Sequence, residues 1–205
     1  MNRPLLITDC DEVLLHMVSH FAEWLEADHG IKFAYETGRF SDALTVVETG
    51  ESLALDQAWL LLDAFFRSEM HRQTLVPGAA EALGRIGEVA DIVVLTNLGS
   101  EAQQWRVEQL ATHGIRHDVI CNSGGKGNPV KDLVTKRRPP SAVFVDDLPQ
   151  HHESVAKYAP DVWRLHMIAE PRVAGAVPSA EYAHARIDDW PTATDWILDK
   201  LSEKL

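Results

Sequence analysis

The feature of this sequence that most constrains its fold is the alternation of short apolar runs with helical patterns. Most of the runs are rich in β-branched residues, which is typical of strands buried on both faces of a parallel sheet. The runs are Leu5–Ile7, Ile92–Leu95, Val119–Cys121, Val143–Val145 and Val162–Met167. Because helical segments separate these runs, the sequence predicts an open α/β sheet of parallel strands.

Turn and capping residues mark where the intervening helices begin and end. Proline suits the first turn of a helix, serine suits the N-cap, and glycine suits the C-terminal end. On these signals we expect helices over about 77–87, over 100–114, from Asn128–Pro129 onward, over 150–158 and over 191–204.

One long stretch, residues 15–75, interrupts the alternation because it contains no convincing strand run. It shows instead two amphipathic helical patterns, over about 16–28 and about 57–71. We therefore expect residues 1–14 and 76–205 to form the α/β core, and residues 15–75 to form a small helical insertion after the first strand.

Polar side chains follow four of the predicted strands. Asp9 and Asp11 follow the first strand, Thr96–Asn97 end the second, Lys126 lies in the loop after the third, and Asp146–Asp147 end the fourth. Ligands of open α/β sheets bind at the carboxyl ends of the strands, so we expect these groups to lie together. Clustered carboxylates repel one another and favour a hard divalent cation such as Mg²⁺. A hydroxyl and an ammonium group suit phosphoryl oxygens, so the set matches phosphoryl transfer.

With these four motifs in this order, the sequence resembles the haloacid dehalogenase (HAD) superfamily. The motifs are Asp9–Val13 after an apolar strand, Leu95–Asn97, Lys126 and Phe144–Asp147. The resemblance covers about 140 residues outside the insertion. It implies a Rossmann-like fold, and it implies that the insertion is a helical cap of the type called C1, which closes over the site and selects the substrate.

The resemblance also implies a role for each motif residue. Asp9 is the expected nucleophile that forms an aspartyl-phosphate, and Asp11 is the expected general acid and base. Thr96 and the backbone N–H of Asn97 are expected to bind the phosphoryl group. Lys126 is expected to steady Asp9 and the transferred oxygens.

The expected metal is Mg²⁺, held by Asp9, by the backbone carbonyl of Asp11 and by the acids of the fourth motif. Aligning Val145–Asp147 with the family's commoner Val-Gly-Asp form places Asp147 at the direct ligand position. Asp146 then binds the metal directly or through water.

Asp11 separates branches of the superfamily, because dehalogenases and phosphonatases lack an acid at this position. The resemblance therefore implies a phosphatase that acts on a small phosphorylated metabolite. A phosphotransferase or sugar-phosphate mutase of the same fold is the alternative, and a non-catalytic HAD-like binding protein is another. A signalling receiver domain also carries Asp, Thr and Lys on a parallel sheet, but its acid pair follows the first strand. In this sequence Thr96 precedes Lys126, and the acid pair Asp146–Asp147 comes last.

Three residue assignments have competing interpretations. Lys131 competes with Lys126 for the lysine role, but Lys126 precedes the predicted helix within a glycine-rich segment that leaves room for a ligand. His151–Glu153 has a metal-like composition, and we expect it to be a solvated helix start. Cys10 lies between the catalytic acids, and we expect its side chain to point away and pack in the core.

Charge and hydropathy limit the partners. Acidic residues outnumber basic residues 31 to 19, and the formal charge of −12 argues against nucleic acid as a partner. The apolar stretch Leu5–Ile7 is far shorter than a signal-peptide core, and no apolar run approaches the ~20 residues of a membrane span. We expect a cytoplasmic protein with no membrane partner and with reduced cysteines. The sequence leaves the oligomeric state open.

Overall fold

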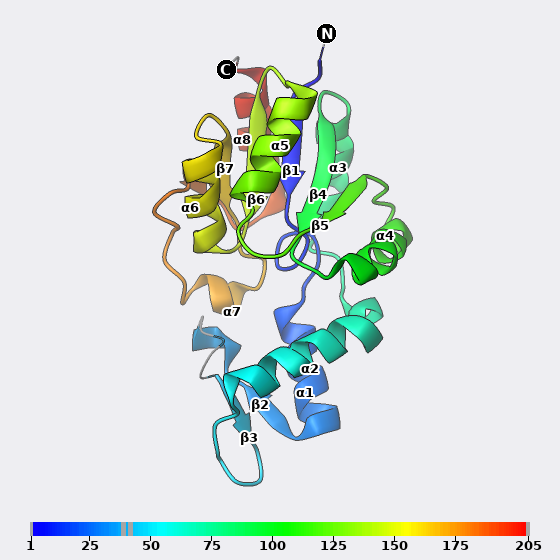
Figure 1. Cartoon of the computed structure of the whole chain (residues 1–205), viewed down its shortest axis with the longest axis vertical. Helices are drawn as coiled ribbons and strands as arrows, with labels where there is room; N and C mark the ends of the chain where they lie inside the picture. The colour runs from blue at the N-terminus through cyan, green and yellow to red at the C-terminus, as the bar shows by residue number, and fades with distance from the viewer. Residues whose placement is uncertain (1, 38–39, 41–42, 204–205) are drawn as a thin grey trace.

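The structure is a computed structural model that describes residues 2–37, 40 and 43–203. Within these residues, six parallel strands form a sheet in the order β5-β4-β1-β6-β7-β8 (Figure 1). The strands are β1 (Leu5–Thr8), β4 (Asp91–Thr96), β5 (Asp118–Cys121), β6 (Ala142–Asp146), β7 (Trp163–His166) and β8 (Ala185–Arg186). The predicted parallel α/β sheet is thus confirmed, with β1 between β4 and β6.

Helices cover both faces of the sheet, which explains why its strands are apolar on both sides. On one face, α3 (Ala79–Gly87) and α8 (Trp190–Ser202) pack with strand residues such as Leu6 and Val94. On the other face, α5 (Gly127–Arg137) and α6 (Pro149–Tyr158) pack with strand residues such as Ile7 and Phe144. Beside β5 lies α4 (Gln103–Thr112), which follows the 3₁₀ turn η3 (Ser100–Ala102).

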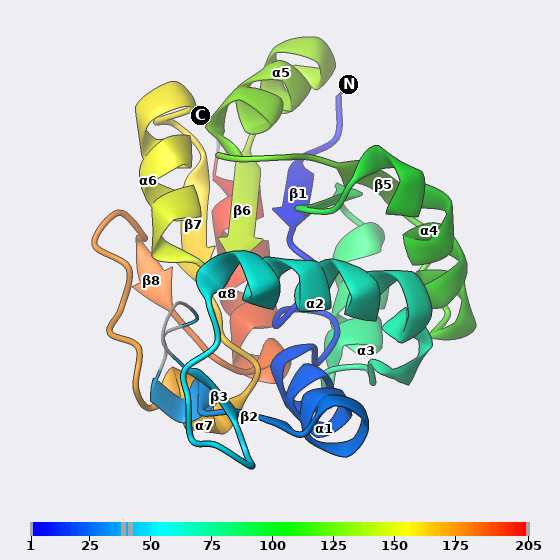
Figure 2. The same cartoon turned by 60° about the horizontal axis from the view of Figure 1, so that its bottom comes forward.

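The insertion after β1 builds a second, smaller core of its own. It contains α1 (Val18–His29), β2 (Ile31–Phe33), η1 (Tyr35–Thr37), β3 (Leu44–Val46), α2 (Leu55–Ser68) and η2 (Met70–Arg72). Phe21, Phe33 and Phe65 are buried at its centre, with ring centroids of Phe33 and Phe65 lying 5.7 and 5.3 Å from that of Phe21. Helix α2 lies across the carboxyl ends of the large sheet (Figure 2).

Two linkers run side by side where the chain enters and leaves the insertion. Leu15 bridges Leu75 in antiparallel fashion, and the His16 N–H donates to the Thr74 carbonyl at 2.9 Å. The buried carboxylate of Glu12 accepts the backbone N–H groups of Met17 and Val18 at 2.8 and 2.6 Å. These two donors belong to the start of α1, so Glu12 satisfies N–H groups that have no partner inside the helix.

The structure corrects several boundaries. The insertion is not free of strands, because β2 pairs with β3 in an antiparallel hairpin. Both strands are only three residues long, which is too short to show a period of two in the sequence. Helix α2 begins at Leu55 after the N-cap Ala54, so Asp56 lies in its first turn. The two-residue strand β8 and the short helix α7 (Pro171–Ala174) were also not predicted.

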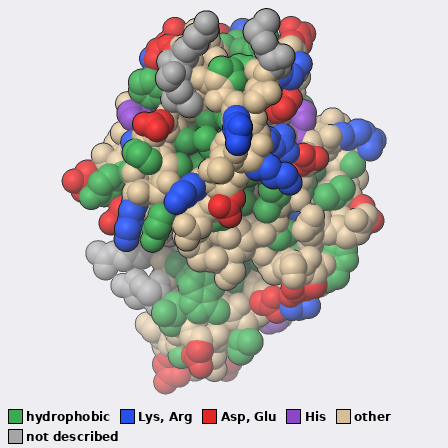
Figure 3. All heavy atoms as spheres, turned by 45° about the horizontal axis from the view of Figure 1, so that its top comes forward, with side chains coloured by type: hydrophobic (Ala, Val, Ile, Leu, Met, Phe, Trp, Pro, Cys, Tyr) green, Lys and Arg blue, Asp and Glu red, His purple; other side chains and the backbone are tan. Residues whose placement is uncertain are grey.

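At the end of the molecule away from α1 and α2, acidic and basic side chains are interspersed (Figure 3). Among the described residues, no helix combines the length and the apolar character that crossing a membrane requires.

Helix α5 approaches α6 closely at Gly127, where an added Cβ would collide with the Ser154 backbone carbonyl. We expect Gly127→Ala to lower the free energy of unfolding by about 1–3 kcal/mol, because backbone must move to admit the methyl group. Gly84→Ala is the matched control, since a Cβ added at this position of α3 would meet nothing within 4 Å. That change should raise stability by about 0.5–1 kcal/mol. Urea unfolding measures both, and equal effects of the two substitutions would contradict the close approach.

Candidate active site

The carboxyl ends of β1 and β6 and the start of α5 meet around the ammonium group of Lys126. Its Nζ lies 2.8 Å from Oδ1 of Asp9 and 2.6 Å from Oδ2 of Asp146. All three side chains are buried, so the ammonium group and the carboxylates that it contacts compensate one another within the protein. Lys131 is exposed, which leaves Lys126 as the lysine that the structure places beside Asp9.

Asp147, the first residue after β6, also belongs to this cluster. Carboxylate oxygens of Asp9, Asp146 and Asp147 lie within 4.8 Å of one another. Both oxygens of Asp146 are already engaged, Oδ2 by Lys126 and Oδ1 by the Leu148 N–H at 2.9 Å. Asp147 instead faces a cavity. Three clustered carboxylates against one ammonium group form a donor set that suits a hard divalent cation.

Thr96 ends β4 and Asn97 follows it, and Asn97 lines the same cavity as Asp9 and Asp147. The Thr96 hydroxyl is buried and has no hydrogen-bond partner among the described residues, so it is available to a ligand. The Asn97 side chain is occupied differently, because its Nδ2 donates to the Gly124 carbonyl at 2.9 Å and its Oδ1 accepts from Asn122. The amide thereby fixes the glycine-rich loop that precedes Lys126.

Asp11 lines the same cavity as Asp9 and Asp147 but has a set of hydrogen-bond partners of its own. One guanidinium nitrogen of Arg106 lies 2.9 and 2.8 Å from the two Asp11 oxygens, and Gln73 donates to Oδ1 at 2.7 Å. Arg106 is fully buried in α4 and also contacts the oxygen atoms of Gln73 and Gln109. The sequence analysis missed Arg106. Its signal is a charged residue four positions from the buried Ala102 and four from the buried Leu110, on the inner face of a helix.

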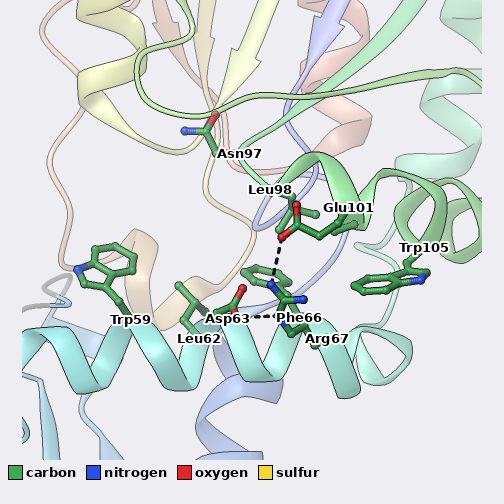
Figure 4. A pocket seen from close by; sticks show the side chains of 11 residues that line it. Trp59, Leu62, Asp63, Phe66, Arg67, Asn97, Leu98, Glu101 and Trp105 are labelled. Carbon is green, nitrogen blue, oxygen red and sulfur yellow. Dashed lines mark hydrogen bonds and ion pairs between the residues drawn. The ribbon is translucent and has the colours of Figure 1, made fainter.

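A cavity of about 710 Å³ opens between these groups and the insertion. Asp9, Asp11 and Asp147 line it on the core side, and aromatic side chains of the insertion line the other side. A smaller hollow of about 200 Å³ adjoins it between α2 and residues 97–105 (Figure 4). There Arg67 of α2 pairs with Glu101 of η3 at 3.1 Å, which ties α2 to the α/β core.

Comparison with solved structures identifies the fold. A HAD hydrolase from Bacillus subtilis bound to magnesium matches with a TM-score of 0.66 and 14% identity, over 96% of this chain and 99% of that one. A phosphoglycolate phosphatase from Lactobacillus plantarum gives 0.62 and 17%, over 95% and 99%. A beta-phosphoglucomutase from Thermotoga maritima gives 0.59 and 14%, over 98% and 100%.

The chain has the haloacid dehalogenase-like fold. No family model matches the sequence, and no curated protein matches it.

The charges of this site perturb one another strongly. Burial raises the pKa of Asp9, although the nearby Lys126 acts in the opposite direction. Burial, with repulsion from Asp146 and Asp9, raises the pKa of Asp147 well above its usual range. Burial alone would lower the pKa of Lys126, but the two carboxylates that it contacts raise it. The cluster therefore carries more negative charge than Lys126 offsets, which is a condition that favours binding of a cation.

Two histidines that sequence reasoning did not assign to the site hold the backbone of the acid pair. The Nε2 atom of His152 donates to the Asp146 carbonyl at 3.0 Å, and that of His166 donates to the Asp147 carbonyl at 2.8 Å. Their rings lie 5.4 Å apart in an edge-to-face arrangement. The prediction that His151–Glu153 is a solvated helix start was wrong for both histidines, because His151 and His152 are buried. Pro149 places them one turn into α6, on the side that faces the sheet.

Cys10 is buried as expected and makes no disulfide. Burial raises the pKa of its thiol, which keeps the group neutral between the two acids.

His152 gives the protein a testable dependence on pH. Burial lowers the pKa of His152 from 6.5 to about 3, so between these values the unfolded chain binds the proton that the folded chain excludes. Stability is therefore lost as the pH falls from 6.5 toward 3, with a slope of at most ~1.4 kcal/mol per pH unit from this group. Replacing the imidazole should remove the contribution of His152 to the dependence of stability on pH.

We expect His152→Asn to be about 1 kcal/mol less stable than the wild type at pH 7.5, since the bond to the Asp146 carbonyl is altered. On acidification to pH 4.5 the gap should close and then reverse its sign, because the wild type loses up to about 2.7 kcal/mol between pH 6.5 and pH 4.5 and the variant does not. Val155→Ala removes packing from the same helix without removing a titratable group, so its gap should stay constant. Urea unfolding across this range measures the gaps, and a constant gap for His152→Asn would contradict the prediction.

Proposed function

We propose that the protein is a magnesium-dependent phosphatase that hydrolyses a small phosphorylated metabolite through an aspartyl-phosphate. The observation that supports this most is the contact of Lys126 with both Asp9 and Asp146, beside Asp147 and the unpartnered hydroxyl of Thr96. The cluster offers a nucleophile, a cation site and an ammonium group for phosphoryl oxygens, and Thr96 at the end of the neighbouring strand β4 offers a hydroxyl. The matched hydrolase and phosphatase structures support the same chemistry.

In the first step, a carboxylate oxygen of Asp9 attacks phosphorus as the bond from phosphorus to the alcohol oxygen breaks. Asp11 donates its proton to the departing alcohol oxygen. Thr96, the Asn97 backbone N–H and Lys126 bind the phosphoryl oxygens. Arg106 and Gln73 hold the Asp11 carboxyl at the edge of the cavity.

In the second step, water attacks the phosphorus of the aspartyl-phosphate, Asp11 takes up a proton from that water, and phosphate leaves. Asp9 and Asp147 would hold Mg²⁺ together with the backbone carbonyl of Asp11, and Asp146 would act through Lys126 or through water. The bound ion supplies charge neutralisation for the phosphoryl group.

We further propose that residues 15–75 act as the cap of this site. The insertion supplies one wall of the cavity and contacts the core through the Arg67–Glu101 pair. A cap in this place excludes water and limits which alcohol can occupy the cavity.

A sugar-phosphate mutase is the alternative, and the matched beta-phosphoglucomutase favours it. A mutase would use Asp9 and Asp11 in the same way but would return the phosphoryl group to a second hydroxyl instead of to water. Release of free phosphate distinguishes the two reactions.

Asp9→Asn removes the nucleophile and should lower phosphate release from a panel of phosphorylated metabolites by at least about a thousand-fold. The fold should persist, because Lys126 keeps its contact with Asp146. Circular dichroism checks folding, and Asp161→Asn at an exposed position is the control that should keep full activity. Normal turnover by Asp9→Asn would end this mechanism, and transfer between sugar positions without phosphate release would support the mutase.

Magnesium should both activate and stabilise the protein. A chelator should stop turnover reversibly, and Mg²⁺ at a hundred times its Kd should raise the Tm by roughly 5–10 °C, which corresponds to about 2.7 kcal/mol. Asp147→Asn should lose most of that stabilisation, because it removes the carboxylate that faces the cavity. Activity in the absence of any divalent ion, or an undiminished Tm shift in Asp147→Asn, would overturn the assignment.

A further inference from the structure

The cavity above the acid cluster has two chemically different ends. Its core side carries the carboxylates of Asp9, Asp11 and Asp147. Its other side is a wall of apolar side chains, which we call the aromatic wall: Phe21, Phe33, Tyr35, Phe40, Trp59 and Phe66. A phosphate at the acid cluster would therefore direct the remainder of its ester toward aromatic rings.

The rings of the aromatic wall are packed against one another. Phe40 and Trp59 have ring centroids 4.7 Å apart, and Phe33 lies edge-on to Phe40 at 5.8 Å. Trp59 projects from α2 toward the core segment that carries Asn97 (Figure 4). Phe40, Trp59 and Phe66 keep part of their surface exposed, and their faces and edges suit another flat ring by stacking or in edge-to-face contact.

The charged groups of the cavity argue against a second charged group on the substrate. Every charged side chain among the described lining residues is acidic: Asp9, Asp11, Glu12 and Asp147. Arg172 lies beside the aromatic wall, with its guanidinium 4.6 Å from the centre of the Tyr35 ring. Arg172 is already paired with Glu170 at 2.9 Å. A second phosphate or carboxylate would thus meet repulsion, and no cationic side chain among the described lining residues would offset its charge.

The aromatic wall is equally unsuited to a sugar. A hexose presents several hydroxyl groups, and each needs a hydrogen-bond partner when it is buried. The aromatic wall, as far as its residues are described, offers only the Tyr35 hydroxyl and the Trp59 indole N–H as polar side-chain groups. The uncharged polar side chains that line the rest of the cavity, Asn97, Gln150 and His151, belong to the core side. A flat apolar group needs no such partners and gains from leaving water.

Resting on the phosphatase function proposed above, we propose that the substrate is a phosphate monoester of an alcohol that bears an aromatic ring and no second charged group. The ring lies against the aromatic wall while the ester oxygen faces Asp11. Trp59 is the residue that best tests this specificity, because it lines the cavity but is 54% exposed, so its removal spares the buried core.

The test compares kcat/KM for 2-phenylethyl phosphate with that for glucose 6-phosphate at saturating Mg²⁺. Both are esters of alkyl alcohols, so their leaving groups react similarly and the ratio reports on binding of the alcohol. We expect the wild type to prefer 2-phenylethyl phosphate by at least about 30-fold, from burial of the ring. Trp59→Ala should lower that ratio about tenfold. Leu60→Ala is the matched control, because Leu60 is the next residue of α2, is 70% exposed and does not line the cavity.

The outcomes separate the two proposals. Release of phosphate from glucose 6-phosphate at an equal or higher kcat/KM would overturn the aromatic substrate and leave the phosphatase intact. A ratio that Trp59→Ala and Leu60→Ala change equally would also overturn it. Absence of phosphate release from these esters and from acetyl phosphate, a small activated substrate, would instead overturn the phosphatase function itself.

Discussion

The rest of the candidate site depends on the buried ammonium group of Lys126. It compensates two buried carboxylates that come from neighbouring strands, Asp9 after β1 and Asp146 at the end of β6. Removing one partner of such a group leaves an uncompensated buried charge, which typically costs about 3–5 kcal/mol. Lys126 reaches this position because α5 begins there and because Gly127 lets α5 approach α6 closely. Packing of two helices on one face of the sheet therefore determines where the charges of the site lie.

The parts of the fold and site that could be predicted are those that depend on local pattern and on a general property of parallel sheets. Buried strands such as Ile92–Leu95 are recognisable as short β-branched runs. Once the strands are placed, their carboxyl ends must meet, so Asp9, Thr96 and Asp146 could be expected at one edge of the sheet from the sequence alone. The HAD resemblance supplied the roles, and the similarity to solved structures establishes the fold.

The remaining features depend on contacts between distant segments, which a single sequence does not specify. Arg106 and Gln73 bind Asp11 across 95 and 62 residues of chain. His152 and His166 lie on an α-helix and on a strand, and their donors meet the backbone of the acid pair only after β6, α6 and β7 have packed. The aromatic residues of the insertion have the spacing of core residues, and several of them also line the cavity. An aromatic residue at helical spacing looks the same in the sequence whether it packs in the core or lines a cavity.

The paired linkers that join the insertion to the sheet have a mechanical consequence. They meet at Leu15 and Leu75, and the same two segments carry Asp11 at one end and Gln73 at the other. A rotation of the insertion about this hinge would shift Gln73 and so pull on the hydrogen bond that it makes to Asp11. Arg106 stays behind on α4, in the core. If residues 15–75 act as the proposed cap, movement of the cap and loss of one of the three hydrogen bonds to Asp11 would therefore occur together.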